Sequence, residues 1–137
     1  MPGAPLLDQK DITIFVVDDD DSVRRALKRL IKVTGFKAQT FGSARQFIDS
    51  GHYQSAGVLV LDVRMPGMSG LELQKHLIDS GSDMPIIFIT AHQDIQARRM
   101  ALEAGAIDFL KKPFEDQALL DAIQWALSSY SSRRNKS

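Results

Sequence analysis

A chain of 137 residues, 44% hydrophobic and 25% charged, has the size and composition of one globular domain. Its seventeen basic and seventeen acidic residues cancel, so net charge gives no reason to expect binding to nucleic acid or to a membrane surface. The lack of cysteine excludes disulfides and thiolate chemistry, and no apolar run approaches the roughly 20 residues that span a bilayer. We therefore expect a soluble intracellular protein.

The two ends of the chain differ in composition from its middle. Residues 1–11 hold two prolines and a glycine, which predicts a flexible lead-in. Residues 129–137 are rich in serine and basic residues without apolar periodicity, which predicts a tail or the start of an interdomain linker. A single folded domain is therefore expected over residues 12–128.

Within this domain, short apolar runs alternate with segments of helical periodicity. The predicted strands are, in chain order, residues 12–17, 37–41, 57–61, 85–90 and 106–110. The predicted helices comprise the apolar positions from Val23 to Ile31, a short helix capped by Ser43, and residues 71–78, 94–104 and 115–128. Strict alternation of this kind predicts right-handed crossovers and a parallel sheet with helices on both faces.

Polar side chains gather where the predicted strands end. Asp18 and Asp19 follow the first strand and Asp62 the third, while Thr90 ends the fourth and Lys112 follows the fifth. An open parallel sheet places its binding site beyond these carboxyl ends. Carboxylates suit Mg²⁺, and a lysine and a hydroxyl beside a metal suit phosphoryl oxygens. One carboxylate is left to act as a nucleophile, since aspartate can form an acyl phosphate.

The stretch FVVDDDDS (15–22) places four like charges directly after an apolar run. Asp18 and Asp19 need a cation to offset their mutual repulsion. We expect Asp20 and Asp21 to serve the first turn of the next helix, where carboxylates cap amides and meet the positive end of the helix dipole.

Four separated motifs agree in order and spacing with one protein family. They are VVDDD (16–20), VLDVRMPGMSGLEL (60–73), FITA (88–91) and FLKKPF (109–114). Together they resemble the receiver domain of bacterial two-component response regulators, and most of all the receivers of the nitrogen-fixation transcriptional regulators, which attach a helix-turn-helix domain. The resemblance implies a cytoplasmic bacterial protein with a flavodoxin-like α/β fold, in which five helices cover both faces of a five-stranded parallel sheet of order 2-1-3-4-5.

The resemblance assigns roles to the acidic residues. Asp62 would be the phosphoryl acceptor. Mg²⁺, with Mn²⁺ as an alternative ion, would be held by Asp18, Asp19, Asp62 and the backbone carbonyl of Arg64. Asp19 would be the principal metal ligand of the pair, and Asp18 would act partly through water.

The resemblance also assigns roles to the remaining strand ends. Lys112 would pair with the Asp62 carboxylate and later with the phosphoryl group. Thr90 would bond to a phosphoryl oxygen, and the small Ala91 would leave that group room. Phe109 matches the aromatic switch position, although an aromatic residue in a strand fits core packing equally well.

Further expectations follow from the same resemblance. The Lys112–Pro113 peptide bond would be cis. Arg64 and His92, each two residues beyond a site residue, would tune the lifetime of the acyl phosphate. Gln93 departs from the glycine common in the closest relatives. Apart from the resemblance, Trp125 lies at helical spacing, which favours packing over a functional role.

The implied partners are proteins rather than nucleic acid or membrane. A sensor histidine kinase would donate the phosphoryl group, and a phosphorylation-dependent homodimer would form through residues 94–104, 106–110 and 115–128. The chain would catalyse only its own phosphorylation and dephosphorylation, so it is not expected to be a multiple-turnover enzyme. No helix-turn-helix sequence lies within it. Both a regulator separated from its transcriptional output domain and a stand-alone receiver, acting by protein contacts or in a phosphorelay, remain open.

Two other classes with aspartates or phosphates at such a site fit less well. Haloacid-dehalogenase phosphatases carry a second acid two residues after the nucleophile, where this chain has Arg64. A flavin carrier needs a phosphate-binding loop after the first strand, and four aspartates there would repel the phosphate.

Overall fold

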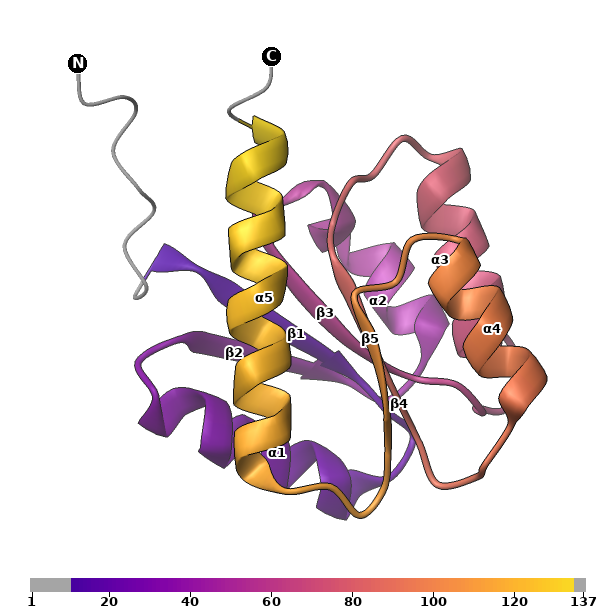
Figure 1. Ribbon diagram of the computed structural model, residues 1–137, viewed down its shortest axis with the longest axis horizontal. Coiled ribbons are helices and arrows are strands. Elements are labelled where there is room, and N and C mark those ends of the chain that lie inside the picture. Colours follow the sequence, from indigo (N-terminus) through magenta and orange to yellow (C-terminus); the bar gives the residue numbers. More distant parts are fainter. Residues whose placement is uncertain (1–10, 135–137) are drawn as a thin grey trace.

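The computed structural model describes residues 11–134 as a parallel sheet covered by helices on both faces (Figure 1). The sheet has the order β2-β1-β3-β4-β5. Its strands are β1 (Thr13–Val17), β2 (Lys37–Phe41), β3 (Gly57–Asp62), β4 (Ile86–Thr90) and β5 (Asp108–Lys111). The helices are α1 (Asp21–Val33), α2 (Ala44–Ser50), α3 (Gly70–Asp79), α4 (Ile95–Glu103) and α5 (Asp116–Arg134), with the 3-10 helix η2 (His52–Gln54). The predicted fold and strand order are confirmed, and the strands agree with their predicted ranges to within two residues.

Two hydrophobic layers, one on each face of the sheet, hold these elements together. Successive strand side chains point to opposite faces, so Phe15 and Leu59 pack with α2, α3 and α4, whereas Ile14 and Val58 pack with α1 and α5. Both layers draw on fully buried strand residues. This explains why β1, β3 and β4 are continuous apolar runs rather than alternating ones.

The parallel register brings the carboxyl ends of the strands to one edge. Val17 pairs with both Phe41 and Leu61, and Thr90 pairs with Lys111. The residues that follow these pairs therefore leave the sheet side by side. The candidate site lies at this edge.

Side-chain caps determine where the helices begin. Asp20 accepts hydrogen bonds from the first amides of α1, and Ser43 caps α2, both as predicted. A capping box begins α3, in which Ser69 and Glu72 bond to each other's backbone amides; this cap was not predicted. Asp94 caps α4, so this helix begins one residue later than expected. These caps set the positions of the loops around the site.

Two expectations for α5 were wrong. The helix continues to Arg134, beyond its predicted end at residue 128, and so extends into the segment predicted to be a tail or the start of a linker. Serine lowers helix propensity only modestly, and neither glycine nor proline interrupts the segment. Trp125 is 70% exposed, because a helical repeat of about 100° per residue places it about 120° from Leu119 and about 160° from Ile123, which are both buried. Residues 1–10 of the expected lead-in (1–11) and the last three residues lie outside the described part.

No helix among residues 11–134 is long and apolar enough to cross a membrane.

Candidate functional site

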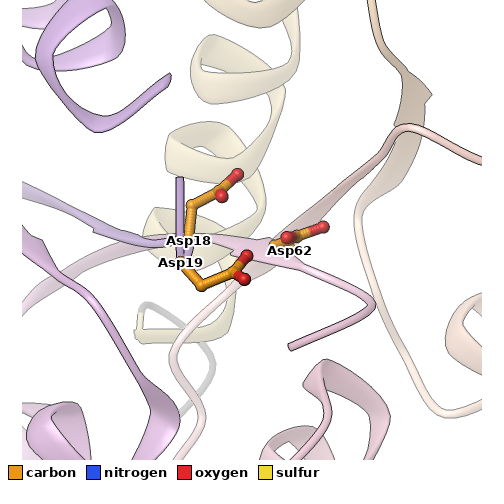
Figure 2. A group of neighbouring side chains, drawn as sticks. All are labelled: Asp18, Asp19 and Asp62. Carbon is orange, nitrogen blue, oxygen red and sulfur yellow. The ribbon is translucent and has the colours of Figure 1, made fainter. Parts of the chain in front are cut away.

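Three carboxylates from two strand ends converge at the edge of the sheet. Asp18 and Asp19 follow β1, and Asp62 is the last residue of β3. Figure 2 shows their side chains gathered at one place. One oxygen from each lies within 4.8 Å of the others. The prediction that these three acids lie close together is therefore confirmed.

The two neighbouring acids have different environments. Asp18 is fully buried; its Oδ1 accepts the Asp20 amide at 2.9 Å and its Oδ2 accepts the Lys112 ammonium at 2.7 Å. Asp19 is exposed, and no hydrogen bond or ion pair joins its carboxylate to another residue of the described chain. Asp19 thus has oxygens available to a cation, whereas the oxygens of Asp18 already have partners within the protein.

Lys112 is shared unequally between the two buried acids. Its ammonium lies 2.7 Å from Asp18 but 3.8 Å from Asp62. The expected partner was Asp62, and this longer contact is present, but the closer partner is Asp18. Asp18 is the more completely buried acid, and a buried charge needs a close counterion most. The Lys112–Pro113 peptide bond is cis, as predicted.

Asp62 is an unusual carboxyl group because it is both buried and surrounded by negative charge. Burial, followed by the charge of Asp18, raises its pKa from 3.8 to about 7, although Lys112 opposes this shift. Asp19 adds a smaller repulsion. A divalent cation would reverse this effect by favouring the ionised form.

The donors present fit a hard divalent cation. Asp18, Asp19 and Asp62 offer only carboxylate oxygens, and their combined charge exceeds that of the single ammonium beside them. Oxygen ligands with excess negative charge are what Mg²⁺ prefers, and a partly open site leaves room for its water ligands.

Glycine is required where α3 begins. An added Cβ at Gly70 would lie 2.2 Å from the backbone oxygen of Asp62 and 3.0 Å from Cα of Val63. The Gly70 amide also donates to the Val63 carbonyl at 2.8 Å. The start of α3 is thus pressed against the chain that carries Asp62. This constraint was not predicted, although Gly70 lies inside the motif at 60–73.

Thr90 lies at the end of β4 with its hydroxyl directed to its own loop. The hydroxyl accepts the His92 amide at 3.1 Å and donates to the His92 carbonyl at 3.2 Å. Ala91 and the His92 side chain are exposed. Phe109 on β5 is half-buried, with its ring centroid 6.0 Å from that of Phe88. The predicted threonine and aromatic residue therefore occupy neighbouring strands.

An ion pair that the sequence analysis missed links two loops at the site. Arg64, two residues after Asp62, lies 3.1 Å from Asp94, the residue that caps α4. The Ala97 amide and, to a smaller extent, the Arg64 guanidinium hold the pKa of Asp94 below its usual value. The loop after β3 is thereby connected to the first turn of α4. No local sequence pattern predicts a contact across 30 residues.

The profile of the family described as the response regulator receiver domain matches residues 14–124. The chain belongs to this family. Receiver domains are signalling proteins rather than classical enzymes. The predicted likeness to the nitrogen-fixation regulators is confirmed by the relatives of this receiver domain.

Those relatives are longer proteins. This receiver domain is 47% identical to nodulation protein W of Bradyrhizobium diazoefficiens over 121 residues, which cover 88% of the chain and 53% of that protein. It is 42% identical to the transcriptional regulatory protein FixJ of Azorhizobium caulinodans, covering 86% of the chain and 56% of FixJ. The chain therefore spans about half the length of the curated relatives that it matches.

Solved structures show the same fold. The response regulator StyR superposes with a TM-score of 0.84 at 52% identity, covering 90% of this chain and 62% of StyR. FixJ-N superposes with a TM-score of 0.80 at 41% identity, covering 86% of this chain and 94% of that one. The likeness extends over nearly the whole described receiver domain.

The raised pKa of Asp62 leads to a test by pH. Because its folded-state pKa exceeds the unfolded value, the folded protein binds more protons, and without Mg²⁺ the free energy of unfolding falls as pH rises from about 4 to about 7. Asp62→Asn removes this loss. Above pH 7 we therefore expect the free energy of unfolding of Asp62→Asn to exceed that of the wild type by roughly 2–4 kcal/mol. Urea unfolding at pH 5 and pH 8 measures the difference, and an equal difference at both values would contradict this prediction.

Proposed function

We propose that this receiver domain accepts a phosphoryl group on Asp62 from the phosphohistidine of a sensor histidine kinase, with Mg²⁺ bound at the site. The observation that carries the proposal is the convergence of a buried Asp62 with the free carboxylate of Asp19 and the ammonium of Lys112. Family membership supports a kinase as the partner.

The chemistry is an in-line displacement at phosphorus. An oxygen of the Asp62 carboxylate attacks the phosphorus atom, and the bond from phosphorus to the imidazole nitrogen of the donor breaks. Asp19, Asp62, the Arg64 carbonyl and, through water, Asp18 would hold Mg²⁺, which would supply positive charge that offsets the negative charge of the phosphoryl oxygens. Lys112, the residue after β5, would supply a second positive charge. Attack by water on the acyl phosphate later releases phosphate and restores the carboxylate.

The switch depends on exchange of hydrogen-bond partners at Thr90. Phosphorylation adds roughly 1.5–2 negative charges and new acceptor oxygens at Asp62. The Thr90 hydroxyl now donates to the His92 carbonyl, and we propose that it turns to a phosphoryl oxygen, for which Ala91 leaves room. Phe109 would rotate into the space that Thr90 leaves, so that the surface near α4 and β5 changes shape.

The output of this switch is proposed to be transcriptional. FixJ and nodulation protein W are roughly twice as long as the matched region, and FixJ is a transcriptional regulatory protein. A stand-alone receiver acting by protein contacts or in a phosphorelay is the alternative. The names of the transcriptional relatives favour the first proposal.

Phosphorylation can be tested directly with a small donor. After incubation with acetyl phosphate and Mg²⁺, we expect the intact mass of the wild type to increase by one phosphoryl group, and no gain without Mg²⁺. Asp62→Asn should gain nothing, because an amide cannot form the acyl phosphate. The control Asp121→Asn removes an exposed acid of α5 and should behave as the wild type. Absence of any mass increase in the wild type would refute the proposal.

The lifetime of the acyl phosphate is proposed to depend on the side chains of Arg64 and His92. Both are exposed, Arg64 in the loop after Asp62 and His92 in the loop after Thr90, and Arg64→Ala also breaks the ion pair with Asp94. We expect Arg64→Ala and His92→Ala to change the dephosphorylation rate severalfold with a smaller change in the phosphorylation rate. Radiolabel loss from purified phosphoprotein measures this, with Arg99→Ala, an exposed arginine of α4, as the control. Equal lifetimes in all four proteins would contradict the proposal.

We propose that the phosphorylated receiver forms a homodimer through α4, β5 and α5. Among the large apolar side chains exposed in the described chain, Ile95, Met100 and Trp125 lie on α4 and α5. Phosphoryl-dependent movement of Phe109 would alter this surface, because Phe109 lines the same hollow as Ile95 and Arg98.

Paired variants test this dimer. Ile95 is 77% exposed on α4 and Val33 is 80% exposed on α1. In acetyl phosphate and Mg²⁺, Ile95→Asp is expected to raise the dimer dissociation constant at least tenfold, because a charge would be buried in an apolar contact. Val33→Asp makes the same chemical change outside the proposed interface and should leave dimerisation unchanged. Sedimentation velocity measures both, and dimers that persist in Ile95→Asp would exclude this surface.

A further inference from the structure

Arg24 of α1 reaches back to the loop that carries the acidic pair. Its Nη1 donates to the backbone carbonyl of Asp18 at 2.7 Å, and its Nη2 donates to Asp21 Oδ1 at 3.1 Å. The side chain is 21% exposed, whereas that of the adjacent Arg25 is 72% exposed. Arg25 also pairs with Asp21, at 3.4 Å, but no contact joins it to Asp18. Of these two neighbouring arginines, only Arg24 hydrogen-bonds to the backbone of Asp18.

The position of Arg24 in α1 explains this reach. Helical side chains lean toward the amino terminus of their helix, and Arg24 lies in the second turn, four residues after the cap Asp20. Its guanidinium rests against Gly42, where an added Cβ would lie 3.4 Å from Nη1. The same end of β2 holds the Asp18 amide, which donates to the Phe41 carbonyl at 3.1 Å.

Every polar group of Asp18 has a hydrogen-bond partner within the protein. Its amide, its carbonyl and both carboxylate oxygens have partners within the protein. The carbonyl of Asp18 and the amide of Asp19 belong to one planar peptide group. A guanidinium that holds this carbonyl therefore also holds the N and Cα atoms of Asp19, the atoms from which the Asp19 side chain extends. The Asp19 carboxylate has no partner of its own among the described residues.

We infer that Arg24 is a positioning residue for the cation site, which holds Asp19 in the orientation that binds Mg²⁺ and so sets the affinity for the metal. This inference rests on the proposed function for the identity of the cation. Arg24 touches neither the metal nor the phosphoryl group in this role. It acts through the Asp18–Asp19 peptide.

The charge of Arg24 acts in the opposite direction from its hydrogen bond. A guanidinium near a cation site repels the cation, so loss of its charge alone would tighten Mg²⁺ binding. Loss of the carbonyl contact would free the Asp19 backbone and weaken binding. The sign of the change in Mg²⁺ affinity therefore separates positioning from simple electrostatics.

The experiment is calorimetric titration of the unphosphorylated protein with Mg²⁺. It is run at a temperature where circular dichroism shows each variant to be folded. We expect Arg24→Ala to weaken Mg²⁺ binding about tenfold, as is usual when an outer partner of a metal ligand is lost. Arg25→Ala, which removes an equal charge from the same helix, should stay within about twofold of the wild type. Arg24→Lys keeps the charge without the planar fork and should fall between Arg24→Ala and the wild type.

The outcomes bear on different proposals. Binding in Arg24→Ala that equals or exceeds that in Arg25→Ala would overturn the inference while leaving the proposed function intact. Lower thermal stability with an unchanged Mg²⁺ affinity would make Arg24 a merely structural residue and also overturn it. Should Arg24→Ala not fold, Arg24→Lys decides: wild-type affinity there refutes positioning, and weaker binding supports it. A wild type that does not bind Mg²⁺ would refute both this inference and the metal-dependent function.

Discussion

Mutual repulsion among three carboxylates is the constraint on which this edge of the molecule depends. One oxygen from each of Asp18, Asp19 and Asp62 lies within 4.8 Å of the others. Among residues 11–134, only the Lys112 ammonium is within ion-pair distance of any of them. The chain tolerates this in two ways. It gives the most buried acid the closest cation, and it lets Asp62 hold a proton more readily than an ordinary aspartate.

The proposed chemistry follows from relief of that repulsion. A divalent cation lowers the cost of an ionised Asp62 and so makes a nucleophile available in a site where burial would otherwise suppress it. Arrival of a phosphoryl group then restores the excess of negative charge. Groups that can turn toward that charge lie nearby: the Thr90 hydroxyl, now bonded to its own loop, and the Arg64 guanidinium, now paired with Asp94. Thr90 bonds to His92 in the loop that leads to α4, and Arg64 pairs with the residue that caps α4.

The sheet tolerates this cluster of charged side chains because the charges stay outside the apolar layers. Both faces of the sheet are covered by fully buried side chains such as Phe15 and Ile14, and the acids stand only where strands end. Loops on either side are held by caps and by Gly70, whose missing side chain lets α3 approach Asp62. Rigid strand ends position the acids, while the ion pair between Arg64 and Asp94 lies among exposed loops.

The sequence by itself determined the alternation of strands and helices, the edge at which the site lies and the caps at Asp20 and Ser43, because these depend on local periodicity and on short-range hydrogen bonds. It could not determine which acid Lys112 approaches, that Trp125 faces solvent or that Arg64 meets Asp94. These depend on relative burial, on helix orientation and on contacts between loops distant in the chain. Only the tertiary structure places such groups at ångström distances, where charge and burial decide which partners pair.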